Sequence, residues 1–101
     1  MAILIVDDSP DQHRLLRSIL AKAGHADIVA ADSAQAAFAT LHLDKEHAPI
    51  NIDLILMDIL MPDIDGIAAC RRIKQNDQLR DIPIIMITAK SGTENLNEAF
   101  S

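Results

Sequence analysis

The segment LILMDILMPDIDG, residues 54–66, places Asp58 inside an otherwise aliphatic run. A short run of Leu, Ile and Met is typical of a buried strand. A charged group among apolar neighbours costs several kcal/mol unless it is paired or faces a pocket. We therefore expect residues 54–57 to form a buried strand, and Asp58 to follow it at a position where its charge has a function.

Short aliphatic runs recur along the chain and alternate with longer segments of helical spacing. Runs this rich in Ile and Leu predict strands that are apolar on both faces, as parallel sheets require. Besides residues 54–57, the expected strands cover residues 2–6, 28–31 and 82–87.

The expected helices lie between and after these strands. Ser9 can cap the first helix, Pro10 suits its first turn, and Gly24 is placed to end it. Its apolar residues recur along one face, namely Leu15, Leu16, Ile19, Leu20 and Ala23. Further helices are expected from Ser33 to about Leu43, from Asp65–Gly66 onward with Ile67, Cys70 and Ile73 at regular spacing, and over residues 93–101.

This alternation of strands and helices predicts an α/β fold. Its sheet is expected to be parallel and doubly wound, with right-handed crossovers and helices on both faces. Ligands of such folds bind beyond the carboxyl ends of the strands. The chain of 101 residues is long enough for one domain, with no linker or repeat.

Composition narrows the function classes. The formal net charge of −6 argues against direct binding of nucleic acid, which needs clustered Lys and Arg. No apolar run is long enough to span a membrane. One cysteine excludes an internal disulfide framework and favours a reducing, cytoplasmic location.

Acidic residues and a hydroxyl follow three of the expected strands. Asp7 and Asp8 follow the first, Asp58 the third, and Thr88–Ala89 the fourth. Carboxylates that meet at one sheet edge repel each other, and a hard divalent cation such as Mg²⁺ relieves that repulsion with oxygen ligands. A carboxylate beside such a cation can also act as a nucleophile toward a phosphoryl group. Alternatively, a single Asp in such a place can simply cap a helix or lie in a loop.

Three segments in this order resemble the receiver domain of two-component response regulators. They are ILIVDDS at residues 3–9, LMDILMPDIDG at residues 56–66 and PIIMITA at residues 83–89. The resemblance implies a flavodoxin-like fold with strand order 2-1-3-4-5. It also implies transfer of a phosphoryl group from a histidine kinase or a histidine phosphotransfer protein.

The resemblance assigns a role to each matching residue. Asp58 would be the phosphoacceptor. Asp8 would bind Mg²⁺ directly, Asp7 mainly through water, and Leu60 through its backbone carbonyl. Thr88 would bind a phosphoryl oxygen and move on activation, and the small Ala89 beside it would leave the site accessible. Met61–Pro62 and Gly66 would shape the loop that leads to the third helix.

One departure from the family pattern concerns a fifth strand. Family members carry a lysine there, and a switch aromatic, whereas this chain ends at Ser101 and Lys90 does not match that lysine. We therefore expect a receiver domain over residues 1–101 that lacks the fifth strand and last helix. The fourth strand would then be an edge, and an open edge favours pairing with a second chain as a homodimer.

Weaker signals favour structural roles. Cys70 is expected to be a packed thiol, and His13, His25, His42 and His47 to be solvated, because they share no metal-ligand spacing. The basic residues Arg71, Arg72 and Lys74 are expected on a solvated helix face. Asp63 and Asp65 superficially resemble a phosphatase D-x-D motif, but a turn and a helix cap are preferred.

The favoured function is a signalling switch controlled by phosphorylation of Asp58, rather than an enzyme with a diffusible substrate. Two alternatives stay open. The chain could be an interaction module of the same fold that works without phosphorylation, or a small phosphatase of similar topology.

Overall fold

The computed structural model describes residues 1–43, 50–61 and 64–87. Strands and helices alternate through this part of the chain. In chain order they are β1 (Ile3–Val6), α1 (Pro10–Lys22), β2 (Ile28–Ala31), α2 (Ala34–Thr40), β3 (Leu54–Asp58), α3 (Gly66–Lys74) and β4 (Ile84–Ile87). The helix expected over residues 93–101 lies outside the described residues.

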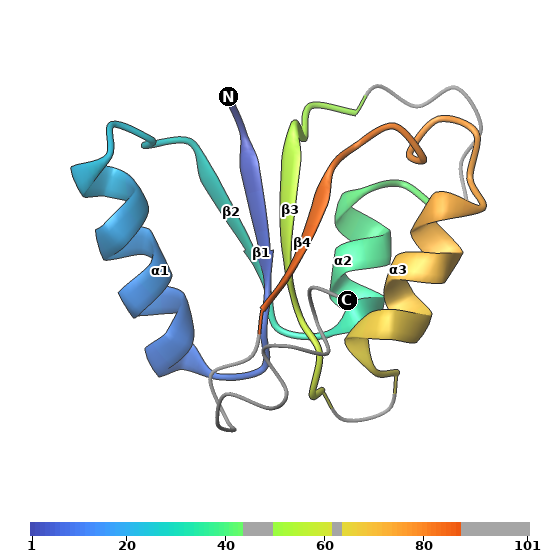
Figure 1. Ribbon diagram of the computed structural model, residues 1–101, viewed down its shortest axis with the longest axis horizontal. Helices are drawn as coiled ribbons and strands as arrows, with labels where there is room; N and C mark the ends of the chain where they lie inside the picture. Colours follow the sequence, from blue (N-terminus) through green and yellow to red (C-terminus); the bar gives the residue numbers. More distant parts are fainter. Residues whose placement is uncertain (44–49, 62–63, 88–101) are drawn as a thin grey trace.

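The strands form one parallel sheet in the order β2-β1-β3-β4. This order confirms the doubly wound arrangement expected from the sequence. Helix α1 covers one face of the sheet, and α2 and α3 cover the other (Figure 1). The crossovers therefore change sides between β1 and β3, and ligands of doubly wound sheets bind at such a point.

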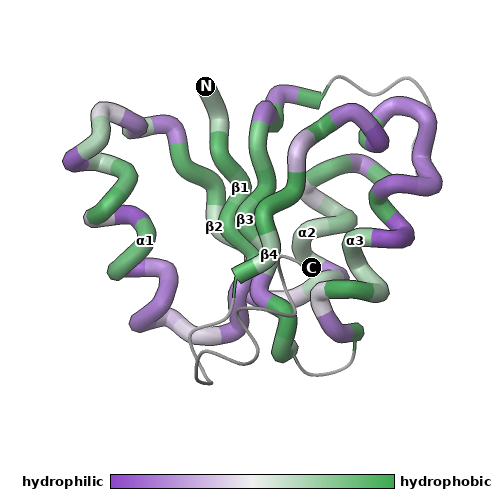
Figure 2. The backbone as a smooth tube through the Cα atoms, viewed as in Figure 1, coloured by the Kyte–Doolittle hydropathy of each residue, from purple (hydrophilic) through white to green (hydrophobic). Residues whose placement is uncertain are grey.

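Burial differs between the inner and the outer strands. Every residue of β1 is buried, and so are residues 55–58 of β3. The expectation that all strands are apolar and buried on both faces is wrong for β2 and β4, which are only partly buried. They lie at the two edges of the described sheet, where one side of the strand has no neighbouring strand. The backbone coloured by hydropathy in Figure 2 nevertheless shows the hydrophobic segments along the centre of the sheet.

The core has two parts, one on each face of the sheet. The larger part lies between the sheet and helices α2 and α3, and includes Leu4, Ile55, Met57, Phe38 and Ile73. The smaller part consists of Ile3, Ile5 and Leu56, against which Leu16 and Leu20 of α1 pack. Alternate residues of β1 thus serve opposite faces, as the pleat of a strand requires.

Helix α1 begins and ends as the sequence predicts. The Ser9 hydroxyl accepts a hydrogen bond from the Gln12 amide at 3.3 Å. At the other end Gly24 adopts a positive φ of 93°. The amides of Gly24 and His25 donate to the carbonyls of Ala21 and Leu20, which is the Schellman arrangement.

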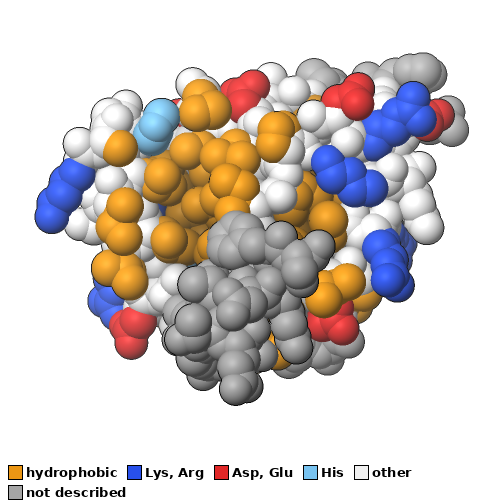
Figure 3. Space-filling view, viewed as in Figure 1, with side chains coloured by type: hydrophobic (Ala, Val, Ile, Leu, Met, Phe, Trp, Pro, Cys, Tyr) orange, Lys and Arg blue, Asp and Glu red, His pale blue; other side chains and the backbone are white. Residues whose placement is uncertain are grey.

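Only part of the apolar face of α1 packs against the sheet. None of the apolar residues that the sequence places along this face is buried, and Leu15 and Ile19 are 54% and 53% exposed. Only Leu16 and Leu20 reach the sheet, because α1 is the only described helix on that face. Hydrophobic side chains consequently gather on the surface between α1 and β4 (Figure 3).

Helices α2 and α3 also depart from the expected pattern. The α2 helix ends at Thr40 rather than Leu43, since His42 has a φ of 55°, which a helix cannot contain. In α3 the buried residues are Gly66, Ala69 and Ile73. The expected stripe is wrong at Ile67, which is 50% exposed, and Cys70 is only half-buried.

Strand β4 begins two residues later than expected, after Pro83, whose nitrogen cannot donate a hydrogen bond to the neighbouring strand.

Among the described residues, no helix has both the length and the apolar character needed to cross a bilayer.

Candidate functional site

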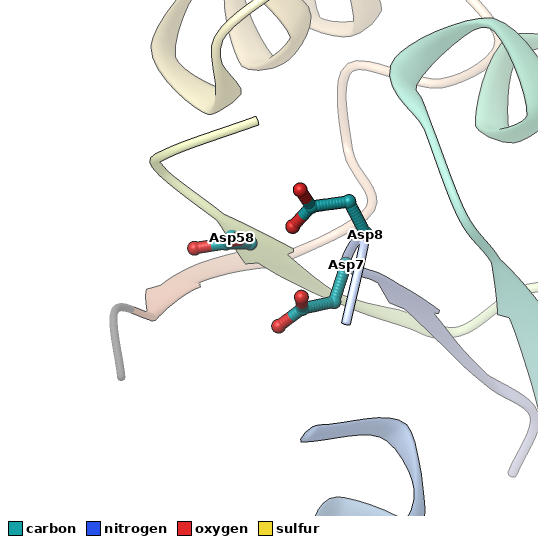
Figure 4. Close-up of side chains that lie close together, drawn as sticks. All are labelled: Asp7, Asp8 and Asp58. Atoms are coloured by element: carbon teal, nitrogen blue, oxygen red, sulfur yellow. The ribbon is translucent and has the colours of Figure 1, made fainter. Parts of the chain in front are cut away.

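Three carboxylates meet at the carboxyl edge of the sheet. The register of β1 and β3 pairs Val6 with Met57, so that Asp7 and Asp58 follow side by side. One carboxylate oxygen from each of Asp7, Asp8 and Asp58 lies within 4.8 Å of the others. Figure 4 shows the three side chains converging from the ends of the two strands. The structure thus brings together the acidic residues that the sequence predicts as a site.

Burial and backbone hydrogen bonds hold this acidic cluster in place. Asp7 is 3% exposed and Asp58 is 1% exposed, whereas Asp8 is half-buried. The Ser9 amide donates to Asp7 Oδ1 at 2.9 Å, and the Leu60 amide donates to Asp58 Oδ1 at 3.3 Å. Each of these carboxylates is therefore oriented by the chain that follows it.

The same cluster has the chemistry of a hard-cation site. All its donors are oxygens, and three negative charges held this close repel each other unless a positive charge lies among them. Leu60, whose backbone carbonyl the family resemblance implies as a further ligand, follows Asp58 by two residues and is 43% exposed. The donors present therefore fit Mg²⁺ or a similar divalent ion.

Thr88 and Ala89 lie outside the described residues. Ile87, which precedes them, pairs with Asp58 across the sheet. Their predicted roles stay predictions.

His13 is a residue of this site that the sequence interpretation missed. It was expected to be solvated, but it is half-buried and its Nε2 lies 2.7 Å from the Asp7 carbonyl oxygen. A carbonyl can only accept, so Nε2 carries the proton and donates. The buried Nδ1 has no partner among the described residues. A signal was available, because a helix capped by Ser9 turns the side chain at position 13 back toward the end of β1.

A pocket of about 510 Å³ adjoins the cluster between the first turns of α1 and α2. Its lining includes Asp7, Asp8 and Asp32 together with Arg14 and Arg17. Basic and acidic groups therefore lie together beside the candidate cation site.

The weaker sequence signals divide into two groups. Asp65 caps α3 by accepting from the Ala68 amide at 2.8 Å, which confirms a cap at that position. Arg71, Arg72 and Lys74 are exposed, as expected for a solvated helix face, but two of them also make specific contacts. The Arg72 guanidinium lies 5.0 Å from the centre of the Phe38 ring, and Lys74 Nζ donates to the carbonyls of Arg80 and Ile82.

A doubly wound parallel sheet with this acidic cluster at its carboxyl edge defines a flavodoxin-like domain with a cation-compatible site. The family model of the response regulator receiver domain matches residues 3–101. The chain belongs to this family.

Individual relatives agree with this assignment. The chain is similar to the polar-differentiation response regulator DivK of Brucella anthropi, with 35% identity over 87% of this chain and 66% of the relative. A solved signal receiver domain of a histidine kinase from Syntrophus aciditrophicus has a TM-score of 0.77 and 35% identity, covering 99% of this chain and 70% of that one. The Mn²⁺-bound response regulator Rcp1 has a TM-score of 0.76 and 28% identity, covering 98% and 73%. The chain thus spans about two thirds of the length of DivK.

We expect His13→Ala to lower the free energy of unfolding by about 1–3 kcal/mol, because the Asp7 carbonyl loses a donor in a part-buried place. Urea denaturation measures the change. His25→Ala is the matched control, since the His25 side chain is also half-buried but has no hydrogen bond among the described residues. Equal losses in the two variants would contradict the assigned contact.

Proposed function

We propose that Asp58 is the phosphoacceptor of a signalling switch that takes its phosphoryl group from a histidine kinase or a histidine phosphotransfer protein. The observation that carries the proposal is the burial of Asp58, within 4.8 Å of Asp7 and Asp8 carboxylate oxygens, in a chain of the receiver-domain family. A buried carboxylate among other carboxylates costs free energy. Such an arrangement is retained where the charges serve a reaction.

The proposed reaction uses one oxygen of Asp58 as the nucleophile. That oxygen forms a bond to phosphorus while the bond from phosphorus to the donor's imidazole nitrogen breaks. The electron pair of the broken bond stays on the imidazole, which then takes up a proton from water. A bound Mg²⁺ would neutralise charge on the transferred phosphoryl group.

The remaining site residues orient these groups. Asp8 would bind the cation directly, Asp7 through water, and Leu60 through its carbonyl. The similar response regulator Rcp1 has a Mn²⁺-bound form, which supports the proposal that this chain binds a divalent ion. Thr88 would bind a phosphoryl oxygen, and Ala89 would leave room for it.

The consequence of phosphorylation would be a shift between two conformations rather than turnover of a metabolite. Such a switch is a binding partner of its phosphodonor and would work in the cytoplasm. The alternative of a phosphorylation-independent module makes the opposite prediction for the experiment below.

Incubation with acetyl phosphate and Mg²⁺ is expected to add one phosphoryl group to the chain, and intact-mass spectrometry detects it. Asp58→Asn removes the nucleophilic charge at constant shape, so the adduct should be lost. Asp27→Asn, which changes an exposed carboxylate at the other end of the sheet, should keep it. No adduct on the unaltered chain would favour the interaction module, and rapid hydrolysis of unrelated phosphomonoesters would favour the phosphatase.

Millimolar Mg²⁺ is expected to raise the thermal unfolding midpoint, because a cation that binds only the folded chain stabilises it. Asp8→Asn should abolish most of this rise, since it removes the proposed direct ligand. Asp27→Asn makes the same change in net charge away from the cluster and should retain the rise. If the Asp8 and Asp27 variants respond alike, the cation does not bind at the cluster.

We also propose a homodimer formed through β4 and the apolar surface beside it. Ile85 of β4 is 42% exposed and lies on the strand at the edge of the described sheet. Static light scattering over a range of concentrations should show a mass that rises toward the dimer. Ile85→Lys should keep the chain monomeric, because an edge lysine opposes strand pairing.

Ile67→Lys is the control for this change, since Ile67 is 50% exposed and belongs to α3 rather than to the edge strand β4. A monomer at every concentration, or equal effects of the two lysines, would exclude this dimer.

A further inference from the structure

Gly66, the first residue of α3, lies directly against the backbone of Asp58. A Cβ built on Gly66 would be 2.0 Å from the Asp58 carbonyl oxygen and 2.8 Å from its carbonyl carbon. Carbon and oxygen atoms in contact are ordinarily about 3.3–3.6 Å apart. The obstacle is backbone, so no side-chain rotation could relieve it. Any side chain at position 66 would therefore push α3 and the end of β3 apart.

Position 66 requires a glycine because there is no space for a side chain, and not because of its backbone conformation. Among the described residues, Gly24 is the glycine with a positive φ, at 93°, and a Cβ there would meet no atom within 4 Å. Gly66 shows the reverse combination, with no positive φ and a severe overlap. A side chain would thus be disfavoured at Gly24 by the backbone conformation and at Gly66 by steric overlap.

Gly66 is also hydrogen-bonded to the residue that directly follows β3. Its amide, one of the donors that a helix start leaves unsatisfied, donates to the Ile59 carbonyl at 2.9 Å. The Leu60 amide donates back to Asp58 Oδ1 at 3.3 Å. One peptide group, made of the Ile59 carbonyl and the Leu60 amide, therefore links the start of α3 to the carboxylate of Asp58.

We infer that Gly66 is a positioning residue for the acidic cluster: its missing side chain lets the start of α3 press on Asp58 and set where that carboxylate lies relative to Asp7 and Asp8. This inference rests on the proposed cation-dependent function. The close approach fixes the Asp58 carbonyl from the α3 side, and pairing with β1 and β4 fixes the strand on its two edges.

The test compares Gly66→Ala with Gly24→Ala in Mg²⁺ titrations followed by isothermal calorimetry, with urea unfolding of the same samples. Gly66→Ala should weaken Mg²⁺ binding by about 10- to 100-fold, the effect usual for residues that orient metal ligands. Gly24→Ala should lose stability through its strained φ and leave Mg²⁺ affinity unchanged. Wild-type affinity in folded Gly66→Ala would overturn the inference.

The outcome is distinguishable from failure of the proposed function, because an unaltered chain that binds no Mg²⁺ contradicts the proposed function instead. If Gly66→Ala does not fold, amide hydrogen exchange of the unaltered chain tests the inference instead. Saturating Mg²⁺ should then slow exchange of the Gly66 amide more than that of the Gly24 amide, which donates to Ala21 at 3.0 Å. Equal slowing of both amides would overturn the inference.

Discussion

The parallel pairing of β1 with β3 is the constraint on which the rest of the site depends. It aligns Val6 with Met57, so the next residue of each strand is a carboxylate at the same edge. Both strands are inner strands of the sheet, and their residues beside the site are buried. The charges are thus held at the ends of the two buried inner strands, where apolar packing offsets the free energy that their proximity costs.

The two faces of the sheet are used differently. On one face, α2 and α3 complete a large apolar core, and α3 begins directly against the end of β3. On the other face, α1 packs through Leu16 and Leu20 and leaves neighbouring apolar residues exposed. The backbone of Asp58 is therefore contacted from the well-packed face, whereas the other face keeps exposed apolar residues.

Much of the fold and the acidic cluster could be predicted from local patterns. The period of the apolar residues distinguishes strands from helices, and residues such as Ser9 and Gly24 bond to groups within a few positions of themselves. Errors arose where burial depends on distant segments. Leu15 and Ile67 have the right spacing for a core but face no described neighbour that would bury them. The missed His13 contact is different, because it joins residues only six positions apart and the Ser9 cap that directs the start of α1 is visible in the sequence.

The sequence by itself determined the order of the elements, the caps of α1 and α3, and which carboxylates follow β1 and β3, because these properties are local. Tertiary structure alone decided the 4.8 Å grouping of the carboxylates and the exclusion of a side chain at Gly66. Each of these depends on the register between strands or the depth at which a helix packs. Such distances are set by the whole core, and no spacing along the chain encodes them.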